Sequence, residues 1–380
     1  MPRHRHTARS THSTEDHVAH ATQDARAEEQ GRTGEQVRTE ERRRSGFVRR
    51  HKAMVIMVVL LLTLLAAVGG WALYLNAQVG HISRFEVDLD RPDRPSRPAG
   101  EATTFLLVGV DAAQAGGSFE NTMKQSSWPI GSYRSDAIMV LRLSADRTRA
   151  TVVSIPRDSY VPVDGYGRTK INAAFSYGGP ELLARTVEDA TGLYLDHVAV
   201  IDFAGFEEAT RVVDGVPVTL SRDEKLDGAD YRAGQHELEG GAALAYVRAR
   251  KSLPRGDFDR VQRQQNFIRG FLDRVGELGP GDPLTGTRLA QQLSKLVAVD
   301  ADLTNGAIRS LAWDLRGFTS GGVDYYTVPT NGTAMVHGAS IVRLDKEATR
   351  GMFTALGKGS IDRWVDRHDV ERLPRRDAVS

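Results

Sequence analysis

The distribution of hydrophobic and polar positions divides the chain into three parts. Residues 1–52 contain few apolar side chains, residues 53–75 form a single apolar run without any charge, and the remainder alternates short apolar runs with polar turns. The run is long enough for a helix to cross about 30 Å of hydrocarbon. We therefore predict a disordered tail over 1–52, a transmembrane helix over 53–75 and a folded region after it.

Charged residues on either side of the apolar run predict its orientation. Six basic residues and no acidic one lie between Arg42 and Lys52, whereas residues 76–90 carry one arginine and three acids. The positive-inside rule then places the N-terminus in the cytoplasm and the folded region outside it, in a single-pass protein of the cell membrane. A cleaved signal peptide is the alternative, but its apolar core would be about 7–15 residues long and followed by a small-residue cleavage site.

The pattern after residue 75 predicts a linker and then a mixed α/β domain. Pro92, Pro95 and Pro98 stand among charges, which is typical of a stiff, extended spacer over 76–100. The domain spans 101–360 and a short tail covers 361–380. Apolar runs and periodicity predict strands at 103–110, 137–143, 150–155, 196–203, 216–220 and 323–328, and helices at 180–190, 206–213, 239–247, 284–299, 305–315 and 344–356.

Three of these strands bring polar residues to one place. Only six residues separate the strands at 137–143 and 150–155, too few for a crossover, so the two strands should pair as an antiparallel hairpin. Asp136, before the first of them, then lies beside Arg157, just past the second. Asp111, after the strand at 103–110, reaches the same edge if that strand has the matching polarity. Two carboxylates there would suggest a divalent metal.

Basic residues gather in short motifs around these strands. Arginine is well suited to phosphate, because its planar guanidinium donates two parallel hydrogen bonds and keeps its proton at physiological pH. Asp257 is predicted to be the N-cap of a helix that carries Arg260 and Gln264 on one face. The candidate residues for a polyanion site are Arg134, Arg157, Lys170, Arg248, Arg250, Asp257, Arg260 and Gln264.

Composition narrows the function classes. Residues 76–380 contain 38 Lys+Arg and 41 Asp+Glu, whereas a nucleic-acid-binding protein usually carries a broad positive surface. The composition therefore disfavours nucleic-acid binding. Zero cysteines exclude disulfides. Taken singly, each arginine could form a surface ion pair worth about 0–1 kcal/mol, and Asp136 or Asp158 could cap a turn. The coincidence of several such donors at element ends favours a polyanion site instead.

These motifs, in this order behind one membrane anchor, resemble the LytR-CpsA-Psr family of cell-wall glycopolymer transferases. The resemblance runs from about Thr103 to Phe271 and more loosely to about Leu356. It implies a three-layer α/β/α domain with a central mixed sheet, in which Asp111 and Asp136 hold Mg²⁺, with Mn²⁺ as an alternative. It also implies that the candidate residues of the polyanion site bind a polyprenyl pyrophosphate, with Arg157, Arg250 and Asp136 as the catalytic residues. One departure is Ala113, where the family commonly has arginine, followed by an intervening stretch over 114–132.

The resemblance implies a phosphotransferase that moves a glycan phosphate from a polyprenyl-pyrophosphate carrier onto peptidoglycan. Two other functions fit the same sequence. A polyprenyl-pyrophosphate hydrolase would use the same site with water, and a non-enzymatic membrane regulator of the cell envelope would tolerate the loss of Arg157 and Arg250. No nucleic-acid partner is expected.

Overall fold

The computed structural model describes residues 63, 74, 77–111, 119–125, 128–131, 133–250, 252–278, 283–315 and 318–380. The predicted tail, nearly all of the predicted transmembrane helix and Ala113 lie outside these residues. None of the helices in the described part combines the length and apolarity that a bilayer crossing requires. The chain divides into two units, 1–73 and 74–380, and the description below concerns the second.

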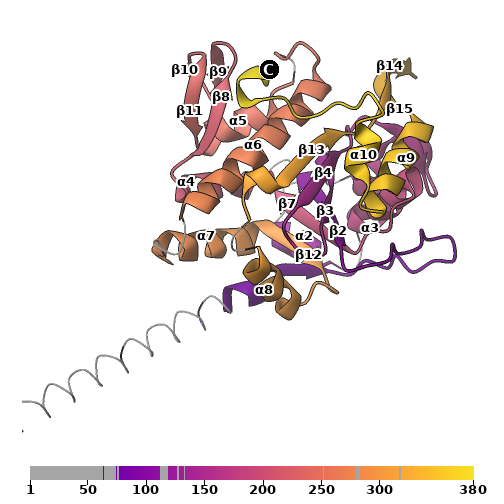
Figure 1. Ribbon diagram of the computed structural model, residues 1–380, viewed down its shortest axis with the longest axis horizontal. Coiled ribbons are helices and arrows are strands. Elements are labelled where there is room, and N and C mark those ends of the chain that lie inside the picture. The colour runs from indigo at the N-terminus through magenta and orange to yellow at the C-terminus, as the bar shows by residue number, and fades with distance from the viewer. Residues whose placement is uncertain are drawn as a thin grey trace, which may run out of the picture. The chain divides into compact units, whose positions relative to one another are not determined.

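A seven-stranded mixed sheet forms the centre of this unit (Figure 1). Strand β2 pairs antiparallel with β3 and parallel with β7, and β3 pairs antiparallel with β4, as the short connection predicted. The strands, in their order across the sheet, are β1 (Ser83–Phe85), β12 (Val297–Asp300), β7 (His197–Asp202), β2 (Thr103–Val110), β3 (Ser135–Leu143), β4 (Ala150–Ser154) and β13 (Val323–Thr327).

Helices cover both faces of the sheet because β2 is apolar on both of its sides. Leu106 and Val108 face a core shared with Leu183 of α3, whereas Phe105 faces Leu311 of α8. One layer contains α2 (Phe119–Met123), α3 (Ile171–Thr191), α9 (Lys346–Gly357) and α10 (Ile361–Val365); the other contains α4 (Phe203–Val212), α5 (Gly240–Arg248), α6 (Asp257–Leu278), α7 (Pro283–Leu296) and α8 (Asn305–Asp314). The expected α/β fold with a central mixed sheet is therefore confirmed.

The described residues also form four two-stranded sheets, and the apolar pattern predicted only one of their strands, β8. The short strands are β5 (Tyr160–Val163) with β6 (Gly167–Lys170), β8 (Val216–Leu220) with β11 (Gly234–Leu238), β9 (Glu224–Leu226) with β10 (Ala229–Tyr231), and β14 (Thr330–Val336) with β15 (Ala339–Leu344). Short 3₁₀ helices are η2 (Ser320–Gly322) and η3 (Arg376–Ala378). The hairpins β5–β6 and β14–β15 matter for the site described below.

Two element boundaries differ from the sequence prediction. The helix expected over 284–299 ends at Leu296, and the residues that follow, Val297–Asp300, form β12 between β7 and β1. The helix expected to begin at Pro180 begins instead at Ile171 and is kinked at Gly178 and Gly179. The glycine-glycine-proline sequence thus marks a kink inside α3 rather than its start.

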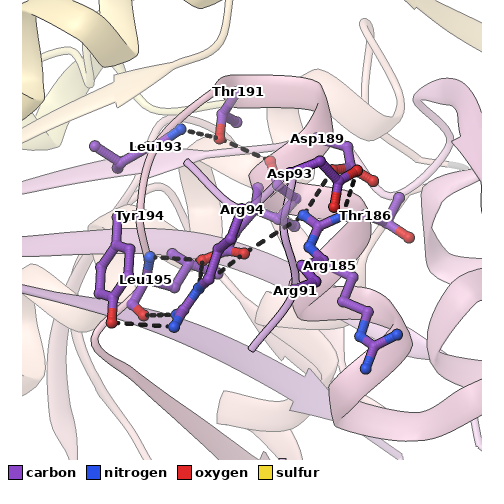
Figure 2. A network of polar contacts seen from close by, with 12 residues as sticks. Arg91, Asp93, Arg94, Arg185, Thr186, Asp189, Thr191, Leu193, Tyr194 and Leu195 are labelled. Atoms are coloured by element: carbon purple, nitrogen blue, oxygen red, sulfur yellow. Dashed lines mark hydrogen bonds and ion pairs between the residues drawn. The ribbon is translucent and has the colours of Figure 1, made fainter. Parts of the chain in front are cut away.

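Arg91 and Arg94, in the segment between β1 and β2, contact α3 and the residues that follow it (Figure 2). Glu188 of α3 is fully buried, and Arg94 pairs with it through an Nε–Oε1 distance of 3.1 Å. Arg94 also donates to the carbonyl of Leu195 at 2.7 Å and lies 3.8 Å above the ring of Tyr194. Burial raises the pKa of Glu188, and the neighbouring Arg94 opposes that rise. The proline-containing stretch expected to be a spacer is therefore fixed to α3 at this point.

We expect Arg94→Met to lower the free energy of unfolding by about 3 kcal/mol near neutral pH, because it leaves the buried Glu188 carboxylate without its main cation. Without Arg94 the pKa of Glu188 rises further. The deficit should therefore shrink as the pH falls through that pKa, because a protonated Glu188 needs no cation. Denaturant unfolding of both proteins between neutral and acidic pH measures this difference.

The matched control is Arg149→Met, since Arg149 is 58% exposed and its ion pairs with Asp324 and Asp362 lie at the surface. That variant should change stability by less than about 1 kcal/mol. Equal losses in the two variants, or a loss in Arg94→Met that does not depend on pH, would show that Arg94 does not serve to neutralise Glu188.

Candidate active site

The candidate site lies at the edge of the sheet where β2, β4 and β7 end and β3 begins. Gly109 of β2 is opposite Ala137 and Val110 is opposite Ser135, so Asp136 is an extra residue in β3. A bulge of this kind redirects a side chain and is frequent beside active sites. Ser135 is buried, whereas the side chain of Asp136 remains 19% exposed and pairs with Arg157. The predicted proximity of Asp136 and Arg157 is confirmed.

A cavity of about 550 Å³ opens at this edge and collects most of the predicted site residues. Phe203 at the start of α4 and Val247 of α5 add an apolar wall, and Ser252 completes the lining. Phe203 belongs both to the hydrophobic core and to this wall. The predicted residues in the cavity are Asp111, Asp136, Arg157, Arg248, Arg250, Arg260 and Gln264.

A glycine permits the apolar wall. A Cβ atom added to Gly109 would lie only 2.5 Å from Cζ of Phe203. A side chain at the end of β2 would therefore push Phe203 out of its place between the core and the cavity. The absence of a side chain here is a packing requirement of the site.

Each of the two predicted metal-binding carboxylates is paired with an arginine. Arg248 Nη2 lies 2.7 Å from Oδ2 of Asp111, and Arg157 pairs with Asp136. Among the described residues no group of three or more His, Asp and Glu side chains could hold a metal ion. Mg²⁺ is commonly bound by one or two carboxylates together with substrate phosphates. Asp111 and Asp136, which line one cavity, would offer such a pair of carboxylates.

Asp257, the first residue of α6, lies close to three of the arginines. It pairs with Arg260, and its Oδ1 lies 3.9 Å from Nε of Arg157 and 4.0 Å from Nε of Arg250. The prediction that Asp257 is an N-cap is wrong: the carbonyl of Gly256 accepts the first helical bond, from the amide of Arg260, so Asp257 is already inside α6. Its carboxylate is consequently available to the guanidinium groups.

Burial affects one member of this cluster in particular. Arg260 is 4% exposed, and burial lowers the pKa of its guanidinium, while Asp257 raises it and Arg157 lowers it again. Arginine stays protonated through such a shift because its ordinary pKa exceeds about 12. The site therefore keeps a charged guanidinium group in a poorly hydrated place, where charges interact more strongly than at the surface.

Arg134 and Lys170 line an adjoining cavity of about 510 Å³, not the first one. Arg157 and Arg250 line both cavities, so the two form neighbouring lobes of one site. Asp158 connects them: it is buried, Lys170 Nζ lies 2.9 Å from its Oδ1, and Arg250 Nη2 lies 2.9 Å from its Oδ2.

Asp158 was not among the predicted site residues. A carboxylate directly after Arg157 reads in sequence as a turn residue, and its burial between two cations depends on segments far along the chain. The one available signal was its place beside Arg157 in a motif already selected for phosphate binding.

This geometry defines a class of α/β/α proteins that hold arginines and carboxylates in a cavity at their strand ends. Residues 80–358 match the LytR_cpsA_psr family, and the chain belongs to that family. It is 33% identical to the cell wall biosynthesis protein LcpA of Corynebacterium glutamicum, over 71% of this chain and 60% of the relative. It is 37% identical to the probable cell wall biosynthesis protein LcpB of the same organism, over 67% and 61%. The chain thus spans about three fifths of the length of these relatives.

Other relatives and solved structures extend the comparison. The regulatory protein MsrR of Staphylococcus aureus is 36% identical over 44% of this chain and 47% of its own length. The crystal structure of TagV from B. subtilis matches with a TM-score of 0.56 and 26% identity, covering 70% of this chain and 98% of that one. A structure of TagT bound to LI-WTA matches with a TM-score of 0.55 and 23% identity over 74% and 98%, which shows the fold alone.

Proposed function

We propose that this protein transfers a glycan phosphate from a polyprenyl-pyrophosphate carrier onto peptidoglycan. The observation that carries the proposal is the cavity in which Arg157, Arg248, Arg250 and Arg260 meet Asp111 and Asp136. These four guanidinium groups come from three separate segments, and each is paired with a carboxylate: Arg157 with Asp136, Arg248 with Asp111, Arg250 with Asp158 and Arg260 with Asp257. A guanidinium carries five N–H donors, so each arginine can bind a pyrophosphate oxygen while it keeps its carboxylate. Membership of the family and the names of LcpA and LcpB support a role in cell-wall biosynthesis.

The residues of the cavity would act by positioning and neutralisation, which supply most of the catalysis in phosphoryl transfer. An acceptor hydroxyl of peptidoglycan attacks the phosphorus linked to the sugar. The new bond joins the acceptor oxygen to that phosphorus, and the bond to the bridging oxygen breaks, releasing polyprenyl phosphate. Arg157 and Arg250 hold the phosphate oxygens, and the acceptor proton passes to a carboxylate or to solvent. Mg²⁺ or Mn²⁺ held by Asp111 and Asp136 would add positive charge at the same oxygens.

Product analysis separates this function from its alternatives. The purified protein is incubated with a glycan-linked polyprenyl pyrophosphate, with and without a peptidoglycan acceptor. A transferase forms a glycan phosphate joined to the acceptor only when the acceptor is present. A hydrolase releases free glycan phosphate in both reactions, and a regulator, the role named for MsrR, leaves the donor intact. The second or third result would overturn the proposal.

The proposed acceptor requires the domain to lie outside the cytoplasm, as the basic residues before residue 53 predict. We expect an alkaline phosphatase reporter fused after Ser380 to be active and a fluorescent reporter that folds only in the cytoplasm to be dark. The opposite pair of signals would place the domain in the cytoplasm. A mature N-terminus beginning after Ala77 would show that the apolar run is cleaved.

A further inference from the structure

The segment after α10 continues the central sheet beyond β13. Two backbone hydrogen bonds join residues 371–373 to this strand: the amide of Thr327 donates to the carbonyl of Glu371 at 2.9 Å, and the amide of Leu373 donates to the carbonyl of Tyr325 at 3.1 Å. The side chain of Leu373 also packs in a hydrophobic cluster to which α6 contributes. The segment is therefore attached both to β13 and to α6.

Glu371 joins this segment to α6 and to the turn that precedes it. Its Oε1 accepts hydrogen bonds from Nη1 of Arg255 at 2.6 Å and from Nε2 of Gln262 at 2.8 Å. Asp259, fully buried in the first turn of α6, accepts from the amide of Arg255 at 2.8 Å and from its Nε at 2.7 Å. Arg255 is thus held between two carboxylates that come from segments far apart in the sequence.

The turn held in this way begins at Arg250 of the candidate site. The amide of Leu253 donates to the carbonyl of Arg250 at 3.1 Å, and the amide of Gly256 donates to the carbonyl of Leu253 at 3.2 Å. Leu253 is buried, and Ser252 beside it lines the same cavity as Arg250. Gly256 has a φ of 59°, which favours glycine. A displacement of Arg255 is therefore transmitted through two short hydrogen-bonded turns to the backbone of Arg250.

We propose that Glu371 is a positioning residue for Arg250 and that it acts through Arg255. Glu371 and Arg255 line neither lobe of the site, so neither side chain contacts a substrate bound there. This inference rests on the proposed function, because Arg250 is proposed to hold the phosphate that is transferred. Such a group has to be held within about 0.5 Å of its productive position, and a displaced guanidinium loses its bidentate geometry.

Rates of glycan transfer by the full-length protein test the inference in two backgrounds. Glu371→Ala should lower the rate by about tenfold, whereas Glu371→Gln, which keeps an acceptor oxygen for Arg255, should recover most of that loss. In protein that already carries Arg250→Ala, the change Glu371→Ala should cost less than about twofold, because the residue that Glu371 positions is gone. A residue that only stabilises the fold would lower the rate by the same factor in both backgrounds.

Hydrogen exchange in the peptide that covers residues 252–258 provides a readout that does not depend on activity. Glu371→Ala should raise the exchange rate of this peptide by about tenfold, because the turn loses one of its two carboxylate contacts. The melting temperature should fall by less than about 4 °C, since the ion pair between Glu371 and Arg255 is partly exposed. The matched control is Asp366→Asn, an exposed acid whose ion pair with Arg372 lies within the C-terminal segment, and it should change neither the exchange nor the rate.

Three results would overturn the inference: unchanged exchange in Glu371→Ala, faster exchange with a normal rate of transfer, or an equal loss of rate in both backgrounds. A wild type that transfers no glycan would instead count against the proposed function. In that case the hydrogen exchange of Glu371→Ala still decides whether Glu371 fixes the turn.

Discussion

Replacing Arg157 or Arg250 with alanine is expected to lower the rate of glycan transfer by about 10²–10³-fold, the usual loss for one preorganised electrostatic contact to a transition state. Both side chains line both lobes of the site, and their Nε atoms lie 3.9 and 4.0 Å from the same oxygen of Asp257. A surface ion pair would contribute only about 0–1 kcal/mol. The rate of transfer, measured with saturating acceptor, therefore distinguishes a catalytic arginine from a structural one.

The double variant and a conservative variant sharpen this test. Because the two arginines are proposed to hold one pyrophosphate, Arg157→Ala combined with Arg250→Ala should lose less than the sum of the single losses, expressed as free energies. Lysine should restore only part of the rate at either position, since it lacks the bidentate guanidinium.

The control for this experiment is Arg149→Ala, an exposed arginine in surface ion pairs away from both lobes. It should transfer glycan at a rate close to wild type. Near-normal transfer by either site variant, or a loss fully explained by a lower melting temperature, would show that these arginines are structural.

Replacing Asp136 with alanine is expected to reduce transfer below about one hundredth of the wild-type rate and to abolish its dependence on divalent metal. Asp136 occupies the bulge of β3 and faces the same cavity as Asp111. The measurement is a titration of transfer with chelator and then with Mg²⁺ or Mn²⁺. Direct Mn²⁺ binding in the presence of pyrophosphate provides a second readout, in which Asp111→Ala should behave like Asp136→Ala.

The ion pair with Arg157 offers a different explanation for a loss at Asp136, because the carboxylate could simply orient that arginine. In that case the residual activity of Asp136→Ala would still rise and fall with metal as in the wild type, and Mn²⁺ binding would be retained. Full activity of the variant in excess chelator would refute the metal assignment altogether.

Local rules predicted one half of the candidate site well. Six residues between two apolar runs allow only a hairpin, and a hairpin places Asp136 beside Arg157 whatever the rest of the chain does. The continuous apolar character of residues 103–110 indicated a buried strand, but whether that strand carries Asp111 to the same edge depended on its polarity, which the sheet pairing shows. The proximity of Asp136 and Arg157 depends on a connection of a few residues, so it could be predicted without the tertiary structure.

Elements whose identity depends on their neighbours were predicted less well. Residues 297–299 continue an amphipathic pattern after α7, yet they form β12 because an edge between β7 and β1 is available to them. Arg168 and Tyr177 also line the second lobe but were not selected at all, since nothing in their local sequence indicates that the β14–β15 hairpin closes a cavity over them.

The order of residues along the chain predicts the chemistry of the site, an excess of arginines with a few carboxylates, and the proximity of the groups that short loops connect. How these groups divide between the two lobes depends on long-range packing. It brought Arg248 and Arg250, about ninety residues beyond Arg157, onto Asp111 and Asp158, and it separated Lys170 and Arg134 into a second lobe. Such long-range pairings are set by the packing of α5 and α6 against the sheet. The burial of apolar surface in that packing contributes much more free energy than a single ion pair does.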